Sequence, residues 1–251
     1  MMRKIVRLFP NSIRLALHRR LRSGFPHHFP AEYAGETFSQ CGEDRILAFL
    51  FNQLAIATPR YLDVGTGHPC VMNNTYLFYR AGANGVCVEP NPDLAALIHE
   101  KRPRDELLNV GVSAEKSGPC HYYLFEDWGL NTFDAEEAAA RARSGKQPIL
   151  KEISVPVATL ESIITDYFPE GLELLSLDAE GLDLALLKSL NYEKHRPLAI
   201  CVETVGFSET LAKPKTNMIT SILAPNGYTP YADTFVNTIY IDTQRTGTVA
   251  L

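Results

Sequence analysis

The sequence predicts an α/β fold, in which a mainly parallel sheet is covered by helices on both faces. Three observations indicate this fold. Short apolar runs alternate with segments of helical periodicity through most of the chain. Polar residues follow several of these runs, as they do where parallel strands end at a ligand-binding edge. The chain has 251 residues, of which 45% are apolar, so one domain can bury a substantial core.

In the first half of this domain, the pattern predicts a helix and then three strands. Residues 42–57 show apolar positions at helical spacing, and Pro59 ends the pattern. Helical segments separate the strands that follow, and Pro92 suits the first turn of the second of these helices. We expect strands at 60–65, 85–90 and 106–113, with helices at 74–80 and 92–101.

The second half continues the alternation after an insertion. Residues 119–125 predict an antiparallel strand, and residues 134–146 predict a polar helix or a mobile loop. Thr159 is placed to cap the next helix, and Asn226-Gly227 closes the last one. We expect strands at 152–157, 172–181, 196–204, 228–232 and 237–242, the last two as an antiparallel pair, and helices at 159–168, 182–190 and 216–227.

Charge is spread unevenly along the chain. Seven of the 24 Lys and Arg residues lie in the first 22 positions, whereas residues 32–251 carry 17 basic and 29 acidic side chains. An acidic body argues against a nucleic-acid-binding protein, because cations are needed to neutralise phosphates. We therefore expect no nucleic-acid partner.

Residues 1–37 predict a basic extension that precedes a domain at 38–251. Arg14 interrupts any apolar core of a secretory signal. Residues 1–31 could form a packed or poorly ordered extension, a transit-peptide-like segment, or a basic amphipathic helix on an anionic membrane surface. The five cysteines form no CxxC pair, which predicts reduced thiols and no zinc site. We expect a cytoplasmic protein, with peripheral contact at the inner membrane face as one alternative.

A glycine turn after the first strand is the main candidate for a ligand site. Gly65 and Gly67 follow the apolar run, and Glu89 ends the next strand. A phosphate-binding loop would need Gly-Lys-Ser or Gly-Lys-Thr, and the NAD fingerprint would need a third glycine where Cys70 stands. Asp63 would face a pyrophosphate unfavourably but suits a cationic ligand such as S-adenosylmethionine. Glu89 would then accept hydrogen bonds from both ribose hydroxyls.

Seven motifs occur in order between about Phe38 and Asp242, namely FSQCGEDRIL, YLDVGTGHP, NNTYLF, GVCVEPNP, VPVATLESII, LLSLDAEGLDLALLKSL and PLAICVET. In this order they resemble the FkbM-type family of class I S-adenosylmethionine-dependent methyltransferases. The most specific motifs are SQCGED and the D-x-E-G block, whereas the glycine turn is generic. The resemblance implies a Rossmann-like sheet of seven strands with an antiparallel last strand, and methylation of hydroxyl oxygens on sugars or natural products.

The resemblance also implies which residues bind the cofactor. Asp63 and the two glycines of the turn would cradle its methionine end, and Glu89 would hold its ribose. The full set assigned to the cofactor is Gln40, Glu43, Asp63, Gly65, Thr66, Gly67, Glu89, Pro90, Asn109, Val110 and Asp178. Helix capping is the alternative role for Gln40 and Glu43. The family more often has small residues and an Asn where His68 and Pro69 stand, which leaves the contacts of Thr66 open.

Acidic residues at two later strand ends are candidates for catalysis. Methylation of a hydroxyl needs a base that takes its proton. Asp178 and Glu180 are one residue apart and point the same way from an extended segment. Either could be the base, as could His68. Alternatively, Asp178 and Glu203 could hold Mg²⁺ between adjacent strand ends and acidify the hydroxyl.

The insertion carries several aromatic residues. Tyr122, Tyr123, Trp128 and Asn131 predict either an acceptor platform for a sugar ring or packing of the insertion on the sheet. We therefore expect an S-adenosylmethionine-dependent O-methyltransferase that acts on a sugar hydroxyl in a glycan or glycolipid precursor. O-methylation of a macrolide-type natural product and a non-catalytic binding module on the same fold stay open. A nicotinamide oxidoreductase is disfavoured by the missing third glycine.

Overall fold

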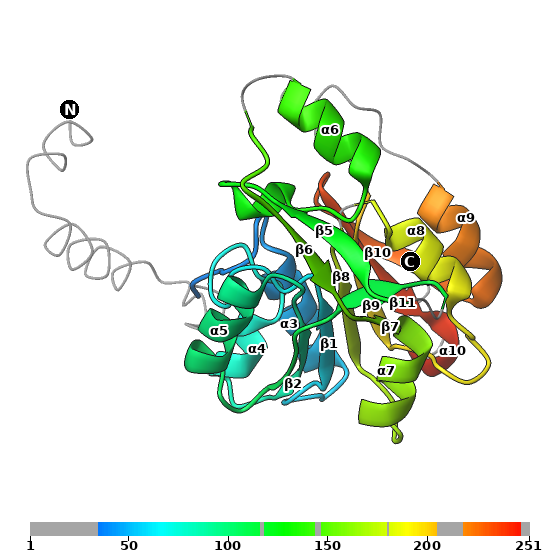
Figure 1. Ribbon diagram of the computed structural model, residues 1–251. Coiled ribbons are helices and arrows are strands. Elements are labelled where there is room, and N and C mark those ends of the chain that lie inside the picture. The colour runs from blue at the N-terminus through cyan, green and yellow to red at the C-terminus, as the bar shows by residue number, and fades with distance from the viewer. Residues whose placement is uncertain (1–34, 116–117, 144–146, 180, 205–217, 247–251) are drawn as a thin grey trace, which may run out of the picture. The chain divides into compact units, whose positions relative to one another are not determined.

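Figure 1 shows the computed structural model of the chain, which describes residues 35–115, 118–143, 147–179, 181–204 and 218–246. The helices and strands described below lie within one compact unit, Thr37–Leu251. Residues 1–34 and Glu180 lie outside the described residues, so the basic extension, its membrane contact and the role of Glu180 stay predictions. No helix in the described ranges is long and apolar enough to cross a membrane.

The central element is a seven-stranded sheet with the strand order β10-β11-β9-β8-β1-β2-β3. Its strands are β1 (Tyr61–Val64), β2 (Gly85–Val88), β3 (Glu106–Leu108), β8 (Leu174–Leu177), β9 (Ala199–Glu203), β10 (Tyr228–Asp233) and β11 (Asn237–Asp242). β11 runs antiparallel to both of its neighbours, β9 and β10, whereas the other neighbouring pairs of this sheet are parallel. The predicted parallel sheet with an antiparallel last strand is confirmed.

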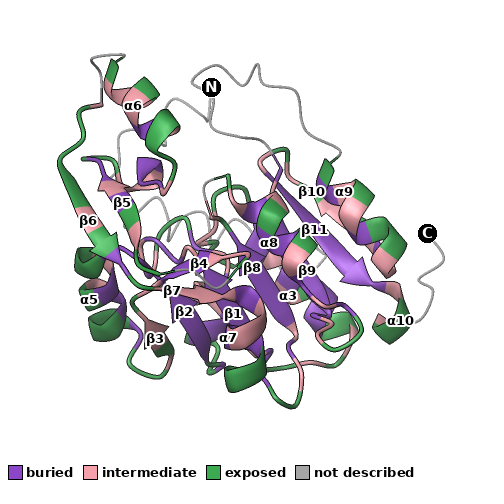
Figure 2. Cartoon of the chain, turned by 45° about the vertical axis from the view of Figure 1, so that its right-hand side comes forward, coloured by how far each residue is buried: buried purple, intermediate pink, exposed green. Residues whose placement is uncertain are grey.

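Two cores form because successive side chains of a strand point to opposite faces. Leu62 of β1 and Leu175 of β8 belong to one core, whereas Tyr61 and Leu174 belong to the other. The first core is covered by α7 (Leu160–Tyr167), α8 (Asp183–Ser189) and α9 (Met218–Leu223), and the second by α3 (Glu43–Gln53) and α4 (Tyr76–Arg80). The central strands are buried along their whole length, as Figure 2 shows in purple.

Three further helices complete the described fold, namely α5 (Pro92–Lys101), α6 (Ala135–Arg143) and α10 (Thr243–Thr246). α5 begins at the predicted Pro92, behind an Asn91 side chain that accepts a hydrogen bond from the Asp93 backbone N–H. α7 begins behind the predicted Thr159 cap. α6 shows that residues 135–143 form a helix, which was one of the two alternatives for this segment.

Two of the predicted strands are each broken in two. The small strands of the insertion are β4 (Gly111–Ser113), β5 (Cys120–Leu124), β6 (Lys151–Val155) and β7 (Val157–Thr159). β4 leaves the central sheet and pairs with β7, while β5 pairs with β6. Pro156 separates β6 from β7, because proline has no N–H to offer a ladder. The carbonyl of Pro156 instead accepts a hydrogen bond from the Gly111 N–H, at 2.9 Å.

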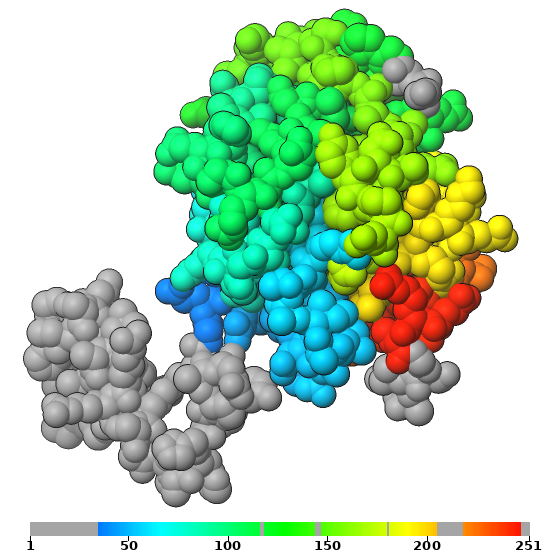
Figure 3. Space-filling model, turned by 90° about the horizontal axis from the view of Figure 1, so that it is seen from below, coloured from blue at the N-terminus to red at the C-terminus, as the bar shows by residue number. Residues whose placement is uncertain are grey.

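An ion pair fastens the end of β11. The Arg196 guanidinium donates to both carboxylate oxygens of the buried Asp242, at 2.8 and 2.7 Å. In the view from below, the red segment that ends β11 lies beside the yellow segment that leads into β9 (Figure 3). This pair therefore joins the end of β11 to the segment that leads into β9.

Gly65 marks a close approach between two strand ends. It has a φ of +73°, and a Cβ built on it would lie 1.8 Å from the backbone oxygen of Asp178. The N–H of Asp178 bonds the Val64 carbonyl at 3.0 Å, so the chain leaving β8 lies directly against the turn that leaves β1. Only glycine fits this position, because both the backbone angle and the space exclude a side chain.

We predict that Gly65→Ala lowers the free energy of unfolding by about 3 kcal/mol or more, since it adds a backbone clash to the strain of a positive φ. Gly82→Ala is the matched control, because Gly82 has a φ of +102° with nothing within 4 Å of a built Cβ. That change should cost about 1 kcal/mol. Urea denaturation measures both values, and equal losses would contradict the close approach.

Candidate active site

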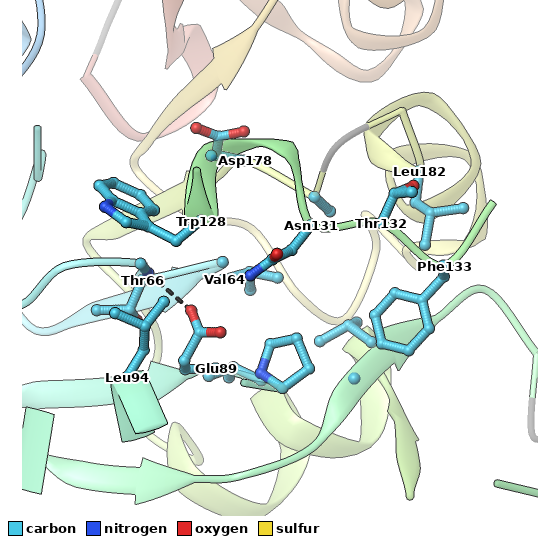
Figure 4. A pocket seen from close by; sticks show the side chains of 18 of the residues that line it. Val64, Thr66, Glu89, Leu94, Trp128, Asn131, Thr132, Phe133, Asp178 and Leu182 are labelled. Atoms are coloured by element: carbon cyan, nitrogen blue, oxygen red, sulfur yellow. Dashed lines mark hydrogen bonds between the residues drawn. The ribbon is translucent and has the colours of Figure 1, made fainter. Parts of the chain in front are cut away.

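A cavity of about 350 Å³ opens at the carboxyl ends of the parallel strands (Figure 4). This volume is within the range of small-molecule sites, roughly 300–1,000 Å³. The lining comprises Gly65, Thr66 and Gly67 after β1, Glu89 and Pro90 after β2, residues 110–112, residues 127–133, and Asp178 and Ala179 after β8, together with Gln40, Val64, Met72, Val88, Leu94, Tyr122, Leu182 and Glu203. The predicted strand-edge residues are thus largely brought together in one cavity.

The glycine turn is folded back onto the end of β2. The N–H groups of Gly65 and Thr66 both point to the Val88 carbonyl, at 3.0 and 3.2 Å. The N–H of Gly67 donates to Glu89 Oε2 at 2.8 Å. Gly67 has a φ of +59°, and a Cβ there would lie 2.5 Å from the Trp128 ring. The turn is therefore clamped between the Glu89 carboxylate and an aromatic ring of the insertion.

Glu89 is a buried carboxylate at the centre of the cavity. Its second oxygen accepts from the Asn91 N–H at 2.8 Å. Burial raises the pKa of Glu89 to about 7, although the hydrogen bonds from the Asn91 and Gly67 N–H groups act in the opposite direction. Each carboxylate oxygen has a second lone pair. Glu89 can therefore accept further hydrogen bonds from a ligand, and its charge changes near neutral pH.

Asp63 lies beneath the turn and does not line the cavity. Its Oδ2 accepts from Asn73 Nδ2 at 3.0 Å and from Thr75 Oγ1 at 2.7 Å, and Arg102 Nη1 lies 3.6 Å away. Arg102 thus places a cation of the protein beside Asp63, and a contact between Asp63 and the cofactor stays a prediction. The carboxylate supports the turn from below, because it joins β1 to the residues that lead into α4.

Arg102 was not found by sequence reasoning. It is 1% exposed, and its Nε donates to Asp105 Oδ2 at 2.7 Å. Its guanidinium lies 5.4 Å from the ring centres of both Tyr61 and Tyr79. A single Arg after an apolar helix gives no sign of this role. The position depends on how α5 packs beside β1.

Several predicted residues take structural contacts. Glu43 accepts hydrogen bonds from Thr234 Oγ1 at 2.6 Å and from Asn237 Nδ2 at 3.0 Å, so it joins α3 to the β10–β11 turn. His68 Nδ1 accepts from the N–H groups of residues 70 and 71, both at 3.1 Å, and shapes its own turn. Asn109 Nδ2 donates to the Glu89 carbonyl at 2.7 Å. None of these three lines the cavity, whereas Gln40 and Val110 do.

The candidates for catalysis and metal binding lie at the cavity rim. Asp178 is exposed and Glu203 is half-buried, and both line the cavity. Within the described ranges, no group of three or more His, Cys, Asp and Glu side chains could hold a metal ion. A metal bound by the two carboxylates alone stays a prediction. Asp183 closes the turn after β8, because its carboxylate accepts from the Ala179 and Gly181 N–H groups at 2.9 and 3.3 Å.

The insertion covers the cavity, as the close-up shows with Trp128 and Asn131 above Thr66 and Glu89 (Figure 4). Of the four residues expected to form an acceptor platform or to pack on the sheet, Tyr122, Trp128 and Asn131 line the cavity. The fourth, Tyr123, packs against a small core around Phe125. The insertion therefore contributes part of the site.

Comparison with known proteins identifies the family. A sequence model of the methyltransferase FkbM domain matches residues 63–230. No curated protein matches the sequence. The strand order and the family together confirm the class I methyltransferase fold.

Solved structures of low sequence identity are similar to the chain. A TehB-like S-adenosylmethionine-dependent methyltransferase from Corynebacterium glutamicum shares 10% identity over 92% of this chain and 97% of that chain, with a TM-score of 0.40. Magnesium protoporphyrin IX methyltransferase from Synechocystis, with bound S-adenosylhomocysteine, shares 10% over 88% and 96%, with a TM-score of 0.43. A putative O-methyltransferase from Klebsiella pneumoniae shares 14% over 95% and 93%, with a TM-score of 0.36. Because the family model spans residues 63–230, the chain belongs to the FkbM methyltransferase domain family.

Proposed function

We propose that the protein transfers a methyl group from S-adenosylmethionine to a hydroxyl of a sugar, in a glycan or a glycolipid precursor. The family supports methyl transfer. The observation that carries the proposal is the cavity itself. It combines the buried Glu89 carboxylate, which accepts a hydrogen bond from the glycine turn, with a rim that carries an aromatic ring, Trp128, and an exposed acid, Asp178. Such a rim suits a polar ring-shaped acceptor, because an aromatic face stacks on a sugar ring.

The residues of the inner cavity fit the cofactor. Gly65 and Gly67 keep the turn free of side chains, because a Cβ at either position would clash with the Asp178 backbone or the Trp128 ring, and a bare backbone suits close contact with a ligand. Glu89 would accept hydrogen bonds from the ribose hydroxyls. Apolar walls at Val64, Val88 and residues 110–112 would contact the adenine. When bound, S-adenosylmethionine supplies a methyl group activated by its positively charged sulfur.

Asp178 is the described residue best placed to receive the proton of the acceptor. As the acceptor oxygen forms its bond to the methyl carbon and the carbon–sulfur bond breaks, the hydroxyl proton must leave. Asp178 follows β8 and lines the cavity where it opens. The segment 127–133 would exclude water and orient the acceptor, which accounts for much of catalysis when the leaving group is already good.

We predict that Asp178→Asn lowers kcat about 10²–10⁴-fold, because the amide cannot take the proton. The affinity for S-adenosylhomocysteine should change less than about threefold, as measured by calorimetric titration. Turnover is followed by release of S-adenosylhomocysteine with a panel of sugar and macrolide hydroxyl acceptors. Asp166→Asn, an exposed acid on α7, is the matched control and should keep wild-type turnover.

Four outcomes of this assay would revise the proposal. An equal loss of affinity and turnover in Asp178→Asn would assign Asp178 to cofactor binding. A loss of turnover in chelator that Mg²⁺ restores would assign Asp178 and Glu203 to a metal. Turnover with macrolide acceptors alone would replace the sugar, and cofactor binding without turnover on any acceptor would favour a binding module.

We predict that affinity for S-adenosylhomocysteine depends on pH through Glu89. Its pKa is about 7, so the carboxylate is mostly charged at pH 8 and mostly protonated at pH 6. Protonation removes an acceptor for the ribose hydroxyls, so binding at pH 6 should be about tenfold weaker than at pH 8. Glu89→Gln should bind weakly with no such dependence. A flat profile for the wild type would show that Glu89 does not hold the ribose.

A further inference from the structure

Asn131 stands out among the polar residues that line the cavity. It is 3% exposed and lies between the 3-10 helix Trp128–Leu130 and the start of α6. Its backbone N–H bonds the Trp128 carbonyl at 3.2 Å. The next residue, Thr132, exchanges two backbone hydrogen bonds with Tyr123, at 2.9 and 3.2 Å. The position of the Asn131 side chain is therefore set by the backbone on both sides.

The orientation of the Asn131 amide is set as well. Its Oδ1 accepts a hydrogen bond from the buried Phe125 N–H at 2.8 Å. A flipped amide would place its NH₂ group against that N–H, with a donor facing a donor. The Nδ2 atom must therefore be on the opposite side. Across the described part of the chain, it is the one buried side-chain nitrogen or oxygen that has no hydrogen-bond partner.

A buried hydrogen-bond donor that has no acceptor lowers the stability of the fold, and a bound ligand that supplies an acceptor removes this cost. The Asn131 side chain points into the cavity from the insertion, while Glu89 enters from the end of β2 (Figure 4). The side chains of Val64 and Leu182, also in the lining, offer no acceptor. The cavity thus presents a free N–H donor and a carboxylate acceptor on different walls. A hydroxyl is the group that uses both, because it accepts one hydrogen bond and donates another.

We propose that Asn131 is a cofactor-binding residue whose Nδ2 donates to a ribose hydroxyl oxygen of the S-adenosyl group, while the same hydroxyl donates to Glu89. This inference rests on the proposed function. It assigns the insertion a role in holding the nucleoside, in addition to any contact with the acceptor. An acceptor sugar also carries hydroxyls, so the experiment uses ligands that contain a ribose and no acceptor.

The test is calorimetric titration at pH 8 with S-adenosylhomocysteine and with 5′-methylthioadenosine, which lacks the amino-acid half. Asn131→Asp keeps an oxygen for the Phe125 N–H and replaces the donor by an acceptor. We expect both ligands to bind at least tenfold more weakly to this variant. Asn191→Asp is the matched control, because Asn191 Oδ1 also accepts backbone N–H bonds, at 3.0 and 3.3 Å, and does not line this cavity. It should bind both ligands as the wild type does.

A second arm separates the hydrogen bond from the charge that Asp brings near Glu89. The 2′-deoxy and 3′-deoxy forms of 5′-methylthioadenosine are titrated into the wild type, Asn131→Asp and the neutral Asn131→Ala. Removal of the hydroxyl that Asn131 contacts should weaken binding to the wild type at least tenfold. The same removal should weaken binding to both variants several-fold less than to the wild type, because their Asn131 donor is already gone and only the hydrogen bond to Glu89 is lost.

The outcomes are distinct. Wild-type affinity in both variants, or equal losses from deoxygenation in all three proteins, would overturn the assignment of Asn131. A loss for S-adenosylhomocysteine without a loss for 5′-methylthioadenosine would place Asn131 against the amino-acid half and overturn the ribose contact. No binding of S-adenosylhomocysteine by the wild type would overturn the proposed function itself, together with this inference. The melting temperature of each free variant shows whether it is folded.

Discussion

The buried carboxylate of Asp63 is the constraint on which the rest of the site depends. A charge in the interior must be neutralised or hydrogen-bonded, and loss of one partner of a buried pair commonly costs about 3–5 kcal/mol. Asp63 satisfies this requirement with Asn73 and Thr75, which follow β1, and with the guanidinium of Arg102, which follows α5. The turn that leaves β1 is therefore held from below, and its upper surface is available for a ligand.

Glu89 shows the opposite balance between burial and charge. It has no cationic partner among the contacts described, and two backbone N–H groups hold its oxygens. Its pKa near 7 reflects that weaker compensation. The two carboxylates lie near the ends of neighbouring strands, yet Asp63 contacts side chains of the protein and Glu89 faces the cavity. Asp63 therefore holds the lower side of the glycine turn in place, while Glu89 remains able to contact a ligand on the other side.

Much of the fold could be predicted from the sequence, because apolar periodicity and turn residues are local signals. Gly65 indicates a tight turn, Pro92 the first turn of a helix and Thr159 a helix cap, and the structure shows these features at the three positions. Long-range contacts could not be predicted. The cationic partner of Asp63, Arg102, lies 39 residues away in the sequence, so no local pattern indicated this pair.

Some residues of the candidate site could likewise be predicted from the sequence, and others could not. Glu89 and the glycines were recognisable from their spacing, whereas the role of Asn131 depends on a hydrogen bond to Phe125 that only the folded insertion brings into being. Likewise, Pro156 was visible in the sequence, but its effect on β4 was not, because it requires a carbonyl that meets Gly111. Signals of that kind arise from three-dimensional packing and have no periodic pattern.

The break at Pro156 also leaves the insertion with a sheet of its own. Among the described strands, β5 and β6 pair only with each other, and contacts of the insertion with the rest of the domain include the Trp128 ring on Gly67. Substitutions on their outer surfaces can accumulate without altering the register of the seven-stranded sheet. A chimaera that exchanges residues 114–156 with those of a relative would therefore change the part of the cavity lining that the insertion supplies and leave the glycine turn and Glu89 as they are, provided that the donor segment retains an amide at the position of Asn131.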